Sequence, residues 1–164
     1  MKSALIRLDS WTVISLALFA LFVFAKTANA ASWHGIEPFK TRRAEVLKTL
    51  GTPLSDAGGD GPLSFKVMGG TVTIFFVDQN LVRAKRLRAD VAGTVLQIVL
   101  QHETSSDTAE SLGLLKNKSY TREDAKEAII FRNLKEGIVY TFVSGKLKTT
   151  RYTFSEDQIG HARR

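Results

Sequence analysis

Residues 64–77 read SFKVMGGTVTIFFV, two runs of strand-forming residues on either side of a Gly-Gly pair. In the second run apolar residues recur at every second position, which is the period of a β-strand with one buried face; they are Val72, Ile74 and Phe76. The pair Gly69-Gly70 fits a two-residue turn, because the favoured hairpin turns need positive φ, which glycine adopts at no steric cost. The stretch therefore predicts a β-hairpin with strands over 64–68 and 71–77.

Further strands are expected toward the C-terminus. Apolar residues share one face of 94–101, while Gln97 and Gln101 lie on the other, and this alternation is typical of an antiparallel sheet with one wet side. Ser144-Gly145 is a second strong hairpin signal. Together these patterns predict strands over 81–88, 94–101, 128–134, 137–143 and 146–154.

Three segments predict helices. Over 41–50 the apolar residues follow the spacing of one helical face, with Thr41 as the expected N-cap and Gly51 as the end. A short helical piece is expected over 105–113, after capping residues. A further helix is expected over 121–127, whose first turn is acidic, as the helix dipole favours.

The chain repeats its own pattern. An apolar set in the first half matches one in the second at a constant offset of 66, and Thr41-Arg42 has a looser counterpart in Thr121-Arg122. The matching positions are Val72, Ile74, Phe76, Val77 and Leu81 with Ile138, Tyr140, Phe142, Val143 and Leu147. We interpret this as two pseudo-repeats, 36–103 and 104–155, each a helix followed by a meander; chance similarity between amphipathic hairpins is the alternative.

The expected fold class is therefore α+β, with tandem helix-plus-meander units and helices packed on one face of an antiparallel sheet. Residues 31–155 form a single domain in this interpretation, and the polar segment 156–164 is expected to be a flexible tail.

Residues 1–30 have the order of a secretory signal peptide: a positively charged start, an uncharged apolar run over 11–24, and a small-x-small cleavage site formed by Ala28 and Ala30. Cleavage would leave Ala31 as the first residue. The apolar run is shorter than the roughly 20 residues that span a bilayer, although an uncleaved membrane anchor is the alternative. We therefore expect an exported protein, periplasmic or extracellular.

The remaining 134 of 164 residues suffice for one domain with a real core. The chain contains no Cys, which excludes disulfides, thiolate chemistry and a lipidated N-terminal Cys. The leader contains three of the 23 Lys and Arg and one of the 16 Asp and Glu, so the mature part has 20 basic and 15 acidic residues. Its net charge of +5 favours anionic partners, and export argues against nucleic acid.

One short segment, 83–88, concentrates positive charge. If it forms a strand, its basic side chains would make an anion- or partner-binding edge; a solvated face or protection of an edge strand are the alternatives. The candidate residues are Arg83, Lys85, Arg86 and Arg88.

No catalytic, cofactor-binding or metal-binding set is expected. A hydrolase needs a nucleophile activated by a base, and the chain contains neither a Cys nor a Gly-x-Ser-x-Gly motif. The spacing of His34, His102 and His161 does not suggest a shared metal, and His102-Glu103 is a weak pair of ligand types. The carboxylate pairs Glu123-Asp124 and Glu156-Asp157 are adjacent in sequence, so they point apart.

Residues 36–53, with a Thr before a helix that ends in Val-x-x-x-Leu-Gly-x-Pro, resemble the opening signature of the SmpA/OmlA (BamE-like) lipoproteins. The doubled arrangement resembles the β-lactamase-inhibitor-protein superfamily, and Trp33-His34-Gly35-Ile36 resembles the mature start of small exported bacterial proteins of unknown function. The resemblance implies tandem helix-plus-meander units and non-catalytic protein binding at the envelope. The absence of a lipidated Cys departs from the lipoprotein pattern and puts a role in barrel assembly in doubt.

Three functions remain open on the sequence. The first is an exported non-catalytic binding domain for a protein or an anionic envelope component, with no cofactor. The second is a hydrolase with a site of scattered Asp, Glu and His, which a crevice joining His102, Glu103 and a further carboxylate would favour. The third is a membrane-tethered accessory protein, which would touch the membrane only through an uncleaved leader.

Overall fold

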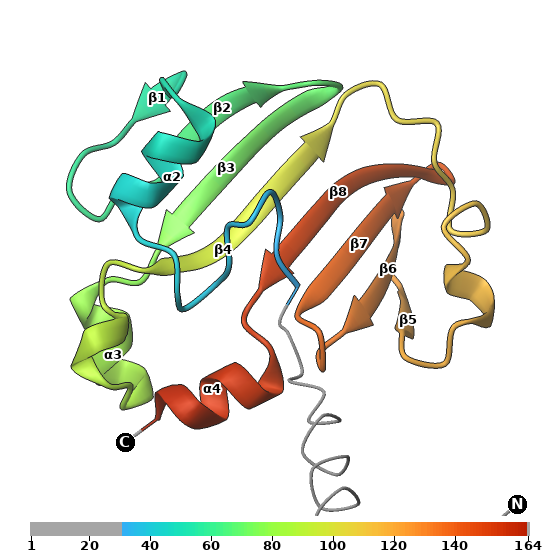
Figure 1. Ribbon diagram of the computed structural model, residues 1–164. Coiled ribbons are helices and arrows are strands. Elements are labelled where there is room, and N and C mark those ends of the chain that lie inside the picture. Colours follow the sequence, from blue (N-terminus) through green and yellow to red (C-terminus); the bar gives the residue numbers. More distant parts are fainter. Residues whose placement is uncertain (1–30, 164) are drawn as a thin grey trace, which may run out of the picture.

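One antiparallel sheet of eight strands runs through residues 31–163, the part of the chain that the computed structural model describes. The strand order is β1-β2-β3-β4-β8-β7-β6-β5, so β4 and β8, the last strand of each half, pair at its centre (Figure 1). The strands are β1 Ser55–Asp56, β2 Leu63–Val67, β3 Gly70–Phe76, β4 Val95–His102, β5 Thr121–Asp124, β6 Ala128–Asn133, β7 Ile138–Val143 and β8 Lys146–Thr153. The α-helices are α2 Arg43–Leu50, α3 Gln79–Lys85 and α4 Glu156–Ala162, and the short 3₁₀ helices are η2 Ala89–Val91 and η3 Leu114–Lys116. The chain is α+β with an antiparallel sheet, as the sequence predicts.

The expected signal peptide, with the expected cleavage residues Ala28 and Ala30, lies outside the described residues. Ala31 is the first residue of the described part, and its amide donates a hydrogen bond of 2.9 Å to the Glu136 carbonyl in the β6–β7 turn. Between residues 31 and 163, no helix has the length and apolar character that crossing a bilayer requires.

The β2–β3 hairpin is confirmed, with its turn one residue earlier than expected. Val67 pairs with Gly70, so Met68 and Gly69 form the turn, and Gly69 has a φ of 82°. Gly70 is needed for another reason, since a Cβ at this position would lie 1.8 Å from the Gln101 carbonyl oxygen of β4. Glycine at position 70 therefore allows the close approach of β3 and β4.

Helix α2 is also confirmed, with Arg42 rather than Thr41 at its N-cap. The Arg42 amide donates to Glu45 Oε2 at 2.7 Å, while Thr41 Oγ1 accepts from the Glu37 amide at 2.9 Å. Thr41 thus closes the turn before the helix, and the helix starts where Glu45 can reach back to an unpaired amide.

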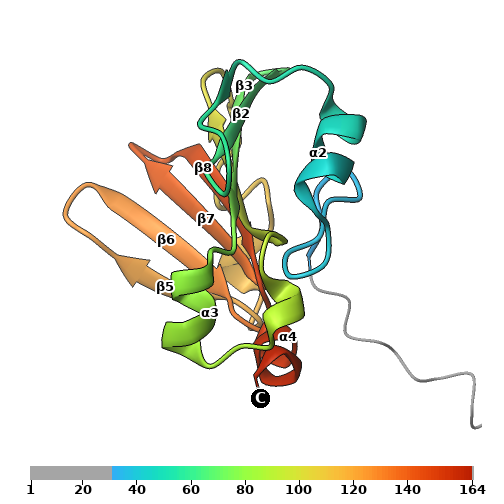
Figure 2. The same ribbon diagram turned by 90° about the vertical axis from the view of Figure 1, so that its left-hand side faces the viewer.

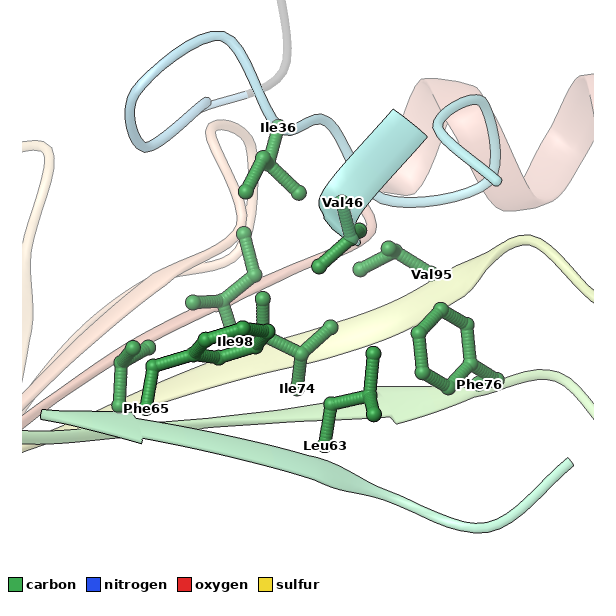
Figure 3. Close-up of a cluster of buried hydrophobic side chains, with 9 residues drawn as sticks. Ile36, Val46, Leu63, Phe65, Ile74, Phe76, Val95 and Ile98 are labelled. Carbon is green, nitrogen blue, oxygen red and sulfur yellow. The ribbon is translucent and has the colours of Figure 1, made fainter. Parts of the chain in front are cut away.

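The first half forms its core between α2 and one face of β2, β3 and β4. Val46 of α2 and Ile36 of the lead-in lie over the strands and are buried (Figure 3). Burial of each such side chain contributes about 1.5–3 kcal/mol. The buried members are Ile36, Val46, Leu63, Phe65, Val72, Ile74, Phe76, Val95 and Ile98.

The second half forms a smaller core on the same face of the sheet. Residues that are register partners on neighbouring strands have their side chains on the same face. Phe131 pairs with Tyr140, Tyr140 pairs with Thr150, and Thr150 pairs with Leu100, which packs against the first core. The segment between β4 and β5 covers this core. Its buried members are Leu114, Phe131, Phe142 and Leu147.

A third apolar cluster lies at one end of the sheet, where α3, η2 and α4 meet (Figures 1 and 2). Figure 2 shows α2 on one side of β2 and β3, with α3 and α4 below the strands. The buried members are Val77, Val82, Leu87, Val91 and Ala162.

The prediction of a strand over 81–88 is wrong, because this segment contains most of helix α3. Asp78 is its N-cap, and Asp78 Oδ1 accepts a hydrogen bond of 2.6 Å from the Leu81 amide. Val82 is buried in the end cluster, and Arg86 ends the helix with a left-handed φ of 53°. The capping carboxylate and the burial of one helical face decide the conformation of a segment whose periodicity is ambiguous.

The helix expected over 121–127 is wrong, because its first four residues form the exposed edge strand β5. Glu123 forms an ion pair of 2.9 Å with Arg132 of β6, and Arg122 pairs with Asp124 at 2.8 Å. The acidic run that resembled the first turn of a helix is therefore the charged surface of an edge strand.

The helical piece expected over 105–113 is replaced by turns, and η3 follows it. The Thr108 amide donates to Ser111 Oγ at 2.9 Å, and the Ser111 amide donates to Thr108 Oγ1 at 3.1 Å. These local bonds compete with the hydrogen bonds of a helix.

Most of the segment expected to be a flexible tail, 156–164, forms helix α4. Buried Ser155 is its N-cap: Ser155 Oγ accepts from the Gln158 amide at 3.1 Å, and the Ser155 amide donates to Gln158 Oε1 at 2.9 Å. Ala162 is buried in the end cluster. A capping box and one apolar face therefore order this polar segment.

Candidate binding site

The four basic residues singled out by the sequence lie on α3 and just after it, and they do not form a strand edge. Arg83 Nη2 donates to Asn80 Oδ1 at 2.7 Å. Arg88 Nε donates to Asp90 Oδ1 at 3.0 Å, and this hydrogen bond lowers the pKa of the Asp90 carboxyl below its usual range. Two of the four side chains are thus already held by neighbours, which weakens the expectation of one concerted anion site.

The other two members, Lys85 and Arg86, form no ion pair with any residue in the part of the chain that the structure describes. Both are exposed. Arg86 borders a shallow hollow with Arg83, whereas Lys85 borders an apolar one at the end of the sheet. The structure therefore separates these two cations.

A broad face of the sheet lies opposite α2. Because side chains alternate along a strand, this face carries the residues between those of the core. The helices that belong to the two cores, α2 and η3, pack on the other face of the sheet. On the face opposite α2, the side chains of the central strands are half-buried or exposed, except buried Val139. They are Thr71, Thr73, Phe75, Gln97, Val99, Gln101, Val139, Thr141, Thr149, Arg151 and Thr153.

Arg151 lies in the middle of this open face. It is the register partner of both Val99 on β4 and Val139 on β7. Its side chain is exposed and forms no ion pair or side-chain hydrogen bond with any other described residue. Toward the edges of the sheet, by contrast, Lys66 pairs with Glu103 and Arg132 pairs with Glu123, each at 2.9 Å.

Among the described residues, His102 forms no hydrogen bond with Glu103, Ser105 or Asp107. His102 Nε2 lies 2.9 Å from Thr150 Oγ1, and burial lowers the pKa of this imidazole, with Asp107 opposing the shift. Glu103 instead forms the ion pair with Lys66. Ser105 Oγ donates to Asp107 Oδ2 at 3.0 Å, so this hydroxyl is bound to a carboxylate and not to the His102 imidazole.

The other two histidines lie in different elements. His34 packs edge-on against Trp33 in the lead-in turn, with ring centroids 4.4 Å apart. His161 Nδ1 lies 2.7 Å from the Asp157 carbonyl oxygen within α4. Within residues 31–163, no group of three or more His, Asp or Glu is placed to hold a metal ion.

Sequence reasoning missed two features, one on the open face and one in the second core on the opposite face. Arg151 stands between Thr149 and Thr153 on the wet side of a predicted strand, and the alternation of that strand could have indicated it. The Tyr120–Tyr140 pair, with ring centroids 5.9 Å apart, had no sequence signal. Burial, and then the neighbouring Tyr140, raise the pKa of Tyr120 to about 12.

Comparison with known proteins identifies no relative: no protein-family model, curated protein or solved structure matches this chain.

Proposed function

We propose that this chain is an exported, non-catalytic binding domain that docks an acidic segment of an envelope protein on its open sheet face. The observation that carries the proposal is Arg151, an exposed cation without an acidic partner among the described residues at the centre of a face built by both halves. Export to the periplasm or outside the cell, and the resemblance of residues 36–53 to SmpA/OmlA lipoproteins, support the same role.

The composition of the face favours a protein partner. Arginine is enriched at the energetic centres of interfaces, where flanking groups exclude water. Half-buried Val99 supplies apolar surface beside Arg151, and the surrounding Thr and Gln side chains can donate and accept hydrogen bonds. An exposed strand face of this kind offers an area that an aspartate- or glutamate-bearing segment can cover.

Cross-linking capture from the native envelope tests the proposal. The bait is the exported protein, as wild type, as Arg151→Glu, and as Lys118→Glu, which makes the same charge reversal on the segment that covers the opposite face. We expect Arg151→Glu to lose the captured protein by about 30-fold or more, because a central interface residue contributes about 2 kcal/mol or more. Equal recovery with all three baits, or no recovery with wild type, would contradict the proposal.

The intact mass of protein recovered from the producing cell tests the export step. A chain that begins at Ala31 supports cleavage, whereas a chain that begins at Met1 and fractionates with membranes supports the tethered accessory protein.

We also propose that the two halves arose by duplication. Strands β1, β2 and β3 correspond to β5, β6 and β7 at the offset of 66. At the same offset, helix α2 corresponds to residues 109–116, which form turns and η3 instead of an α-helix. Thr121-Arg122, which the sequence pairs with Thr41-Arg42, lies instead in β5. The segment that contains α3 and η2 separates β3 from β4 in the first half, and its absence between β7 and β8 accounts for the shorter second half.

A further inference from the structure

A small apolar hollow opens at the end of the sheet where α3 and α4 meet the ends of β4 and β8. Its volume is about 300 Å³, which is at the small end of the range for ligand pockets. Six of its nine lining residues are large and apolar, and most of these are only partly buried. The lining consists of Phe39, Leu81, Lys85, Leu87, Leu96, Gln97, Thr153, Phe154 and Ile159.

Two backbone irregularities shape this hollow. Phe39 has a φ of 60°, a left-handed conformation that is rare for a bulky residue, and its ring stacks on Phe154 at 4.8 Å. The β3–β4 register pairs Phe75 with Gln97 and Phe76 with Val95. Leu96 is therefore the extra residue of a bulge, and it packs with the end cluster instead of the core under α2.

Both irregularities place an apolar side chain at the wall of the same hollow. Strained backbone and bulges recur where a binding site requires a particular side-chain direction.

The polar groups of the lining are few, and one of them carries a charge. Lys85 is the charged member, and it forms no ion pair with the residues that the structure describes. Gln97 and Thr153 are neutral and lie side by side as register partners on β4 and β8. No carboxylate lines the hollow, so its electrostatic preference is for an anion.

We propose that this hollow binds an unbranched aliphatic monocarboxylate, the anion of a medium-chain fatty acid. The aliphatic tail lies among Phe39, Leu96, Phe154 and Ile159, and the carboxylate faces the Lys85 ammonium. A short tail matches a volume of about 300 Å³, and a single charged group matches one cation. The hollow shares Gln97 and Thr153 with the margin of the open sheet face, but Arg151 is not part of its lining, so this inference does not rest on Arg151.

Calorimetric titration of the exported protein with hexanoate, octanoate, decanoate and dodecanoate, each below its micelle-forming concentration, tests the tail. We expect the Kd to fall roughly fourfold for each added methylene, which corresponds to about 0.8 kcal/mol per buried methylene. The gain should stop once the hollow is filled. An affinity that does not change with chain length, or no saturable binding, would overturn the proposal.

Variants test the head group and the location. Lys85→Met should weaken octanoate binding about fivefold, as expected for an exposed ion pair of about 1 kcal/mol, and should leave octanol binding unchanged. Lys118→Met removes the same charge elsewhere and should leave both affinities unchanged. Ile159→Trp should fill the hollow and abolish binding.

Ile159→Trp could disturb α4. The comparison of octanoate with octanol binding in Lys85→Met therefore tests the assignment of the hollow independently, because Lys85 is exposed. Equal octanoate affinities of wild type and Lys85→Met would refute the assignment. Arg151→Glu should still bind octanoate, so failure of the docking proposal and failure of this one are distinguishable.

Discussion

The same substitution, Gly→Ala, should change stability in opposite directions at two positions. At Gly70 the new Cβ would lie 1.8 Å from the Gln101 carbonyl oxygen, and real Cβ atoms essentially never approach closer than 3.0 Å. Strands β3 and β4 must therefore move apart at this pair. Such overpacking costs about 1–3 kcal/mol, and each ladder hydrogen bond lost adds about 0.5–1.5 kcal/mol. We expect Gly70→Ala to lower the free energy of unfolding by about 2–4 kcal/mol.

Gly160 lies inside α4, where a Cβ meets nothing within 4 Å and φ is not positive. Alanine is favoured over glycine in a helix by about 0.5–1 kcal/mol, so Gly160→Ala should stabilise the protein by that amount. Urea unfolding, followed by the fluorescence of half-buried Trp33, measures both changes. With an m-value of about 2 kcal/mol/M, the Gly70→Ala midpoint should fall by about 1–2 M. A Gly70→Ala midpoint equal to that of wild type would refute the close approach of β3 and β4.

Three further predictions concern two half-buried side chains and one buried one. Burial lowers the pKa of His102 below 6.5. The unfolded chain therefore binds more protons than the native protein near this pH, and the free energy of unfolding falls as the pH drops below 6.5. His102→Gln should flatten that part of the curve of urea midpoint against pH. Burial raises the pKa of Tyr120 to about 12. The unfolded chain therefore releases this proton at a lower pH than the native protein does, and the free energy of unfolding falls as the pH rises from 10 toward 12. In Tyr120→Phe, the titration of the native protein followed by tyrosinate absorbance should lose the step at the highest pH. Phe142→Ala removes a buried ring that packs edge-on against Phe131 at 5.8 Å, and should cost about 3–5 kcal/mol in urea unfolding.

The strands of both hairpins could be predicted from the sequence because their signals are local. Alternation over 71–77 and 137–143 and the turn glycines depend only on neighbouring residues. The turn at Ser144-Gly145 is confirmed: both residues have positive φ, 50° and 76°. The displaced turn at Met68-Gly69 could not be predicted, because Gly70 is required by the backbone of β4, a strand far along the chain.

Helix α3 and the end cluster could not be predicted because their burial depends on distant segments. Leu87 forms a bridge with Arg163, and Arg88 donates a backbone hydrogen bond to the Ala162 carbonyl at 2.7 Å. Without helix α4, the segment 81–88 looks like a basic strand. The alternation over 94–101 predicts a wet side of the sheet, but the central place of Arg151 on it depends on the β4–β8 register. The apolar hollow could not be predicted, because it depends on the Leu96 bulge.

The pairing of β4 with β8 also sets the order in which the chain can fold. A polypeptide emerges from the ribosome N-terminus first, so β4 is complete long before β8 exists. During that interval, the β4 backbone amides and carbonyls that later pair with β8 form an open sheet edge. This edge can pair with the same strand of a neighbouring nascent molecule. We expect that β8 closes this edge when it pairs with β4, and that truncated or stalled chains that lack β8 associate with one another.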